Sequence, residues 1–282
     1  MEIKLGSYEV KSASDTVSRL AMILWGVAGS FKTTLAATAP GKKLWLQFDD
    51  GGTNSIASLS QDCQVPDSVL NQEILVADFS HEKNNLIEKF KQDDGLKLAQ
   101  LFEAHPDIET VVVDSVTRAS QMALEHVIKT GPFNKSTLEL PGLGAYGARN
   151  ALILRMFVDI MNVTGKYKKN VIFICHEGEP KTNDDGIVLQ ITMNLGGSLA
   201  SLTTQKMGEC WFVQDVKGER KIYLRPFRSF KPMKSRMFDL GPGKPGEFVW
   251  KYDINNPDPK FEIATWYNKW REGNGAKIGI PI

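Results

Sequence analysis

A short stretch near the start of the chain has glycines, a lysine and adjacent threonines at a spacing that suits phosphate binding. Gly26 and Gly29 permit backbone conformations that other residues avoid. Lys32 offers a charge for the outer phosphates of a nucleotide, and Thr33 offers a hydroxyl for Mg²⁺. The helix expected to begin there would direct its unpaired N–H groups at the anion. The predicted loop for ATP comprises Gly26, Val27, Ala28, Gly29, Ser30, Phe31, Lys32, Thr33 and Thr34.

One residue departs from the usual pattern G-x-x-x-x-G-K-[ST], because Phe31 stands where the pattern has glycine. A large residue before the lysine limits how the loop wraps around phosphates. Two interpretations stay open: a loop that binds and hydrolyses ATP, and a loop that binds ATP with impaired hydrolysis. A purely structural alternative is a Gly-rich turn between a strand and a helix with a chance lysine.

Further polar side chains follow apolar runs that predict strands. These side chains are Asp49 and Asp50 after residues 43–48, Asp114 within the run 108–115, and His176 after residues 170–175. Ligands of parallel sheets bind at the carboxyl ends of the strands, so all of them are expected near the phosphate loop. Asp114 is predicted to hold Mg²⁺ together with Thr33. The structural alternatives are solvated carboxylates in a turn and a histidine without a functional role.

The elements that must position these residues alternate between strands and helices. Strands are predicted at 22–25, 43–48, 74–77, 108–114 and 170–175, and helices at 33–38, 53–59, 84–102, 116–129 and 148–163. This alternation predicts an α/β fold with helices on both faces of a mainly parallel sheet. Antiparallel strands at 210–214 and 221–226 and a helix at 261–272 are expected to follow. Residues 130–146 and 178–198 are expected to form long loops.

The amino-acid composition is that of an ordinary globular protein. Of 282 residues, 42% are hydrophobic and 24% are charged, and the formal net charge is +1. The chain as a whole therefore has no strong electrostatic field that would favour binding to nucleic acid or to a membrane. Cys63, Cys175 and Cys210 lack the spacing of metal ligands, which predicts free thiols in a reducing compartment. The sequence has no signal-peptide pattern and no apolar run near the roughly 18 residues that span a bilayer, so a soluble intracellular protein is expected.

A local excess of positive charge lies within this near-neutral chain. Between residues 217 and 236 the cations are Lys217, Arg220, Lys221, Arg225, Arg228, Lys231, Lys234 and Arg236, and the carboxylate is Glu219. Arg225, Arg228 and Lys231 could contact a DNA backbone, which would make binding depend on salt. The alternative is a solvated basic face.

The order of these motifs resembles the RecA-type recombinase core, and more closely the phage RecA-like ATPases of the single-strand-annealing class. The matching segments are residues 26–33, 48–51, 111–115, 175–176, 196–197 and 234–236. The resemblance covers roughly residues 19–240 and implies a RecA-like P-loop ATPase core there. Residues 1–18 would form an N-terminal extension, with an edge strand at 2–5, and residues 241–282 a C-terminal extension with a short helix.

The resemblance implies roles in ATP hydrolysis. Asp49 would orient the attacking water, with Asp50 as its substitute. The family usually has glutamate there, so the shorter side chain implies a closer water or slow hydrolysis. His176 would sense the γ-phosphate, and Lys234 and Arg236 would reach the site of a neighbouring subunit.

The resemblance also implies a function linked to DNA. Loops at 140–147 and 179–197 match those that RecA-type proteins lay along single-stranded DNA. Tyr146 could stack on a base, while Arg149 and Lys181 are candidate phosphate contacts. The expected protein is a head-to-tail filament or ring that promotes annealing or recombination in the cytoplasm of a bacterial host. A single-strand-binding protein is a further expected partner, and no membrane is involved.

Rival functions stay open. A ring-forming replicative helicase or a helicase loader could use the same core. A nucleotide-gated DNA-binding module without efficient hydrolysis would agree with Phe31 and Asp49. A small-molecule kinase is disfavoured, because no arginine cluster typical of a lid follows the sheet.

Overall fold

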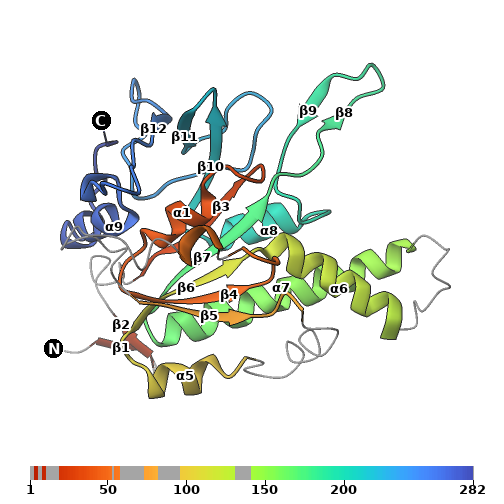
Figure 1. Cartoon of the computed structure of the whole chain (residues 1–282), viewed down its shortest axis with the longest axis horizontal. Coiled ribbons are helices and arrows are strands. Elements are labelled where there is room, and N and C mark those ends of the chain that lie inside the picture. The colour runs from red at the N-terminus through yellow and green to blue at the C-terminus, as the bar shows by residue number, and fades with distance from the viewer. Residues whose placement is uncertain are drawn as a thin grey trace.

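A large sheet forms the centre of the molecule (Figure 1). The computed structural model describes residues 3–5, 8–10, 19–52, 54–57, 73–81, 96–130 and 141–281. The strands, in their order across the sheet, are β12 (Glu247–Val249), β11 (Glu219–Tyr223), β10 (Glu209–Val216), β3 (Ala21–Gly26), β7 (Asn170–His176), β6 (Ile108–Asp114), β4 (Lys42–Gln47) and β5 (Ile74–Asp78). Pairing is parallel from β10 to β5 and antiparallel at β11 and β12. This mainly parallel sheet confirms the predicted α/β class, and the antiparallel pair β10–β11 confirms the predicted hairpin.

Both faces of the sheet are buried, which explains why its strands are continuously apolar rather than alternating. In β3, Ile23 and Trp25 belong to one core, while Met22 and Leu24 belong to the other. Because successive side chains of a strand point to opposite faces, β3 contributes to two cores at once.

Helices cover each of these cores. Helices α5 (Leu98–Ala104), α6 (Val116–Thr130), α7 (Leu143–Lys166) and α8 (Leu199–Lys206) pack on one face. Helices α1 (Lys32–Ala37), α2 (Asn54–Ala57) and α9 (Ile263–Glu272) pack on the other. The segment 241–282, expected as an extension, thus supplies the edge strand β12 to the central sheet and helix α9 to its second core.

The loop predicted for residues 130–146 is wrong at residues 143–146, because helix α7 begins at Leu143 rather than near residue 148. Gly144 and Gly147 each cost about 1 kcal/mol relative to alanine within a helix. Burial of Ala145 and of the following apolar face against α6 and α8 offsets that cost. Residues 131–140 lie outside the described residues.

The second predicted loop, at 178–198, contains a hairpin instead. Strands β8 (Lys181–Thr182) and β9 (Val188–Gln190) pair antiparallel and project away from the central sheet (Figure 1). The turn between them is set locally, because the Asn183 side chain accepts hydrogen bonds from the N–H groups of Asp185 and Ile187. Gly186 supplies the positive φ of 78° that this turn needs.

The predictions for the N-terminal strand, the helix at 84–102 and the cysteines agree in part with the structure. The predicted strand at 2–5 is β1 (Ile3–Leu5), which pairs with β2 (Tyr8–Val10) in a separate hairpin. Most of the helix predicted for 84–102 falls outside the described residues, and its described part begins at Leu98. Cys175 and Cys210 are buried free thiols, while Cys63 lies outside the described residues.

Candidate nucleotide-binding site

The loop between β3 and α1 closes around the lysine side chain. Lys32 is 4% exposed, and its Nζ donates to the carbonyl of Gly26 at 3.1 Å, to the carbonyl of Val27 at 2.5 Å and to Ser30 Oγ at 3.3 Å. Burial lowers the pKa of Lys32 to about 8, although nearby Asp114 opposes the shift. A cavity of about 260 Å³ lies over the loop, lined by residues 28–34 with Asp114 and His176.

Backbone geometry explains the unusual residues of this loop. A side chain at Gly26 would place its Cβ 2.1 Å from the carbonyl oxygen of Val213 in β10, so only glycine fits. Phe31 has a φ of 55°, the left-handed conformation that favours glycine and costs other residues about 1–2 kcal/mol. Its ring stacks on Trp250 with centroids 5.0 Å apart. A stacked pair contributes about 0.5–1.5 kcal/mol, which offsets much of that cost.

The structure brings together the two residues predicted to hold Mg²⁺. Thr33 Oγ1 donates to Asp114 Oδ2 at 3.0 Å, joining the start of α1 to the end of β6. Burial raises the pKa of Asp114 to about 6, although the hydrogen bond from Thr33 opposes the shift. Hydroxyl and carboxylate oxygens suit Mg²⁺, which commonly takes one or two carboxylates together with nucleotide phosphates. Within the described residues, no group of three or more His, Cys, Asp or Glu side chains forms a candidate metal site.

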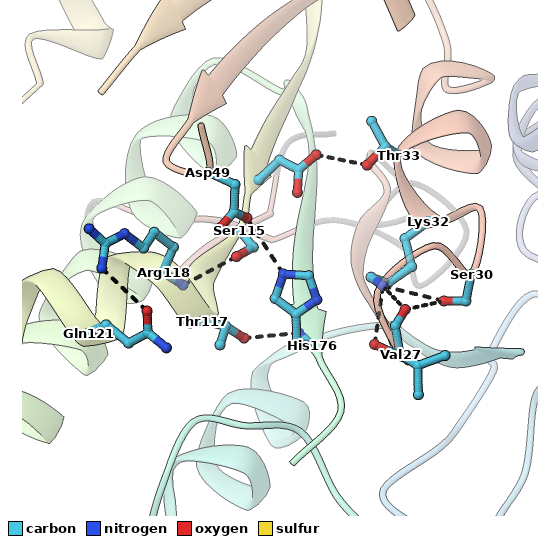
Figure 2. A network of polar contacts seen from close by, with 12 residues as sticks. Val27, Ser30, Lys32, Thr33, Asp49, Ser115, Thr117, Arg118, Gln121 and His176 are labelled. Carbon is cyan, nitrogen blue, oxygen red and sulfur yellow. Dashed lines mark hydrogen bonds and ion pairs between the residues drawn. The ribbon is translucent and has the colours of Figure 1, made fainter. Parts of the chain in front are cut away.

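Asp49 and His176 meet beside this pair (Figure 2). Asp49 Oδ2 lies 3.6 Å from His176 Nε2. Burial alone would raise the pKa of Asp49, but His176 and Ser115 outweigh it and hold the pKa below its usual value. The backbone N–H of His176 donates to Thr117 Oγ1 at 2.9 Å, which fixes the end of β7 against α6. Asp49 is therefore an ionised acceptor held close to the cavity at neutral pH.

The other ring nitrogen of His176 lacks a protein partner among the described residues. Its Nδ1 is buried, and no residue in the described part of the chain accepts from it or donates to it. Figure 2 shows the ring lying between Asp49 and Lys32. By contrast, the Asp50 side chain is 81% exposed and its Oδ1 lies 3.7 Å from His81 Nε2. Of the two neighbouring aspartates, Asp49 is the one that contacts a residue of the cavity.

Lys234 and Arg236 lie beside β10, outside the lining of this cavity. Lys234 exchanges backbone hydrogen bonds with Cys210. The buried carboxylate of Glu209 accepts from the backbone N–H groups of Arg236 and Met237 and from the indole of Trp211. The segment is thus rigidly anchored, while the Arg236 side chain is exposed.

The candidate DNA contacts fall into separate groups. Lys181, Arg228 and Lys231 are exposed, and the hairpin is tied to the basic segment through the Lys231 N–H to Ile191 carbonyl bond of 3.0 Å. The Arg149 guanidinium lies 5.1 Å from the ring of Tyr146.

Arg225 belongs to neither group. Its guanidinium donates to the carbonyl of Lys244 and packs against Gly246, so it joins the segment after β11 to the segment before β12.

The site includes residues to which the sequence motifs gave no role there. Ser115 hydrogen-bonds to Asp49, and Thr117 accepts from the backbone N–H of His176. Both residues closely follow Asp114 in the sequence, and this position could have indicated that they belong to the site. Trp250 and Arg220 contact Phe31, and no local pattern connects them with the phosphate loop.

Comparison with models of protein families places the chain in a known family. A family model described as an AAA domain, AAA_24, matches residues 18–229, a stretch that contains Lys32, Asp49, Asp114 and His176. No curated protein matches the chain. Among the described helices, none combines the length and the apolar character needed to cross a bilayer.

Proposed function

The chain belongs to this family of AAA domains, which are P-loop ATPases, and from that premise we propose that it binds ATP with Mg²⁺ and hydrolyses it. The observation that carries the proposal is the 3.0 Å contact between Thr33 and Asp114, next to the buried amine of Lys32. An amine and a hydroxyl from the phosphate loop and a carboxylate from the end of β6 thus lie around one cavity.

The residues of the loop account for phosphate binding. Lys32 exchanges its bonds to the carbonyls of Gly26 and Val27 for phosphate oxygens, and the exposed residues 27–29 leave room for them. Thr33 and Asp114 would hold Mg²⁺, which when bound would supply positive charge against the charge that develops on the phosphates.

The pair Asp49 and His176 accounts for hydrolysis. Asp49 is ionised and accepts a proton of the attacking water, which it orients towards the terminal phosphate. In its imidazolium form, which has a proton on each ring nitrogen, His176 donates from Nδ1 to a phosphate oxygen while Nε2 faces Asp49, and this contact links phosphate binding to water orientation. Asp50 takes no part, because it faces solvent.

Mutation of the lysine tests ATP binding. Lys32→Ala removes charge-assisted hydrogen bonds, and we expect the dissociation constant for Mg·ATP in calorimetry to rise about 10- to 100-fold. Lys206→Ala, at an exposed position in the last turn of α8, is the matched control and should bind as the wild type does. Unchanged affinity in Lys32→Ala would contradict the proposal.

We further propose that the ATPase acts on single-stranded DNA, in annealing or recombination, as a head-to-tail filament or ring. The support is a group of three exposed cations, Lys181, Arg228 and Lys231. Hydrogen bonds join the projecting hairpin, which carries Lys181, to residues 229–231, so the three cations belong to one part of the molecule. Cations of this kind bind phosphate backbones.

ATPase rates with and without single-stranded DNA, together with particle size by light scattering, test this second proposal. Stimulation by DNA and particles larger than a monomer are expected. ATP-driven unwinding of duplex DNA by a closed ring would favour the helicase instead. A monomer whose turnover ignores DNA would exclude both.

A further inference from the structure

Ser115 is a buried serine that no step of the proposed hydrolysis uses. It is 0% exposed and directly precedes α6. Its Oγ accepts a hydrogen bond from the backbone N–H of Arg118 at 3.2 Å, and its carbonyl accepts from the N–H of Ala119 at 3.1 Å. A serine in this position caps a helix, because it satisfies one of the N–H groups that have no partner within the first turn. The start of α6 therefore fixes the direction of the Ser115 side chain.

The hydroxyl proton of Ser115 is directed at Asp49. A serine hydroxyl has a single proton to donate, and the N–H of Arg118 occupies an acceptor position of the oxygen and leaves this proton free. Ser115 lies beside Asp49 in Figure 2, and its hydroxyl hydrogen-bonds to the carboxylate. Because Ser115 is fully buried, water does not compete for the proton. The hydroxyl thus connects the cap of α6 to the carboxylate of Asp49.

The backbone around Asp49 does not by itself fix where the carboxylate points. Strand β4 ends at Gln47, and Asp49 begins a turn in which the N–H of Gly52 donates to the Asp49 carbonyl at 3.2 Å. The side chain is instead held from two sides, by His176 of β7 at 3.6 Å and by Ser115 before α6. Two contacts from different elements restrict the carboxylate more closely than either contact does alone.

We propose that Ser115 is a positioning residue of the ATPase reaction, which holds the Asp49 carboxylate in the orientation that accepts a proton of the attacking water. The inference rests on the proposed function, because it depends on Asp49 as the group that orients the water. Ser115 lies outside the lining of the cavity over the phosphate loop, so it acts through Asp49. The position of such a group matters, because a displacement of about 1 Å near the reacting atoms can cost about 100-fold in rate.

Ser115→Ala tests this role, because it removes the hydroxyl without adding bulk. A hydrogen bond to a charged group corresponds to a factor of about 10 to 100, and we expect kcat for ATP hydrolysis to fall by that much. The dissociation constant for Mg·ATP in calorimetry should stay within about twofold, since the hydroxyl makes no contact with the phosphates. Ser120→Ala is the matched control, because Ser120 is a 4% exposed serine further along α6, and its variant should change neither quantity.

A double-mutant cycle with Asp49→Asn separates positioning of Asp49 from a general effect on the fold. If Ser115 acts through Asp49, the hydroxyl has no carboxylate left to position in the Asp49→Asn background. The kcat of the double variant should then stay within about twofold of the kcat of Asp49→Asn alone. A serine with a merely structural role would lower kcat by the same factor in both backgrounds, and that outcome overturns the proposal. Unchanged kcat in Ser115→Ala, or a loss of affinity as large as the loss of kcat, overturns it as well.

If Ser115→Ala does not fold because the cap is lost, Ser115→Gly replaces it. Glycine serves nearly as well as serine at the start of a helix but has no hydroxyl, so the same fall in kcat and the same result in the cycle are expected. A wild type that does not hydrolyse ATP overturns the proposed function, and the role of Ser115 with it. A wild type that hydrolyses ATP, together with a fully active Ser115→Gly, overturns the role of Ser115 alone.

Discussion

Phe31 shows that the glycine of the phosphate-loop pattern meets a demand of the backbone. The residue has a φ of 55°, and it keeps the conformation that glycine would adopt. Its ring is accommodated because Trp250 and Arg220 lie against it. The loop therefore retains the shape that places Lys32 and Thr33 at the cavity. The presence of phenylalanine instead of glycine thus gives no structural reason to expect a loss of ATP binding.

The first prediction at the scale of residues concerns Asp49. Asp49→Asn keeps the size of the side chain but removes the acceptor charge beside His176, so we expect kcat for ATP hydrolysis to fall about 100-fold or more. The dissociation constant for ATP should stay within about twofold, since binding depends on Lys32. Steady-state kinetics and calorimetry measure the two quantities.

Asp50→Asn is the control for that experiment. Its carboxylate is exposed and close to His81, so this variant should hydrolyse ATP as the wild type does. Loss of turnover in Asp50→Asn with normal turnover in Asp49→Asn would reverse the roles given to the two aspartates.

At the scale of elements, strand register brings the site together. Gly26 at the end of β3 pairs with His176 at the end of β7, and Gln47 at the end of β4 pairs with Asp114 at the end of β6. Parallel strands present their carboxyl ends on the same edge, so residues far apart in the chain converge there.

A prediction at this scale concerns Lys43, which is fully buried in β4. Its Nζ donates to the Gly41 carbonyl at 2.9 Å, and burial lowers its pKa to about 8, against the opposing effect of Glu262 and Glu109. Between pH 8 and 10.5 the folded protein loses this proton while the unfolded chain keeps it. The free energy of unfolding should therefore rise with pH in this window by an amount on the order of 3 kcal/mol.

Urea unfolding of the wild type and of Lys43→Met across pH 7.5–10.5 measures this contribution. The variant has no proton to lose at this position, so its stability should rise less steeply than that of the wild type. Lys42→Met is the control, because Lys42 is a neighbour in β4 that forms ion pairs with Glu73 and Asp107 at the surface. Parallel curves for the wild type and Lys43→Met would contradict the prediction.

At the scale of the whole molecule, the C-terminal segment and the phosphate loop form one body. Strand β12 closes the central sheet, α9 covers a core shared with α1, and Trp250 contacts the loop itself. The anchored segment with Lys234 and Arg236 lies apart from the cavity of its own chain. An exposed arginine on a rigid segment is suited to act on the site of a neighbouring subunit.

The prediction at this scale is that Arg236→Ala impairs only the assembled enzyme. If Arg236 acts on a neighbouring site as proposed, kcat should fall about 1,000-fold, as it does when an arginine finger is removed, with unchanged affinity for ATP. Mixing this variant with inactive Lys32→Ala should restore part of the activity, because one subunit then supplies the arginine and its neighbour the intact loop. No recovery in mixed assemblies would show that Arg236 does not act across an interface.

The sequence by itself determined the phosphate loop, the alternation of strands and helices, and the aspartates and histidine at the strand ends. These features follow from short patterns, because local conformation and burial act over neighbouring residues. Tertiary structure decided the start of α7, where packing of Ala145 outweighs two glycines. It also decided which aspartate contacts His176: Asp49 lies beside it, whereas the exposed Asp50 lies beside His81. Tertiary structure likewise decided the contact of Phe31 with Trp250, because these residues are distant in the chain and only the packed sheet brings them together.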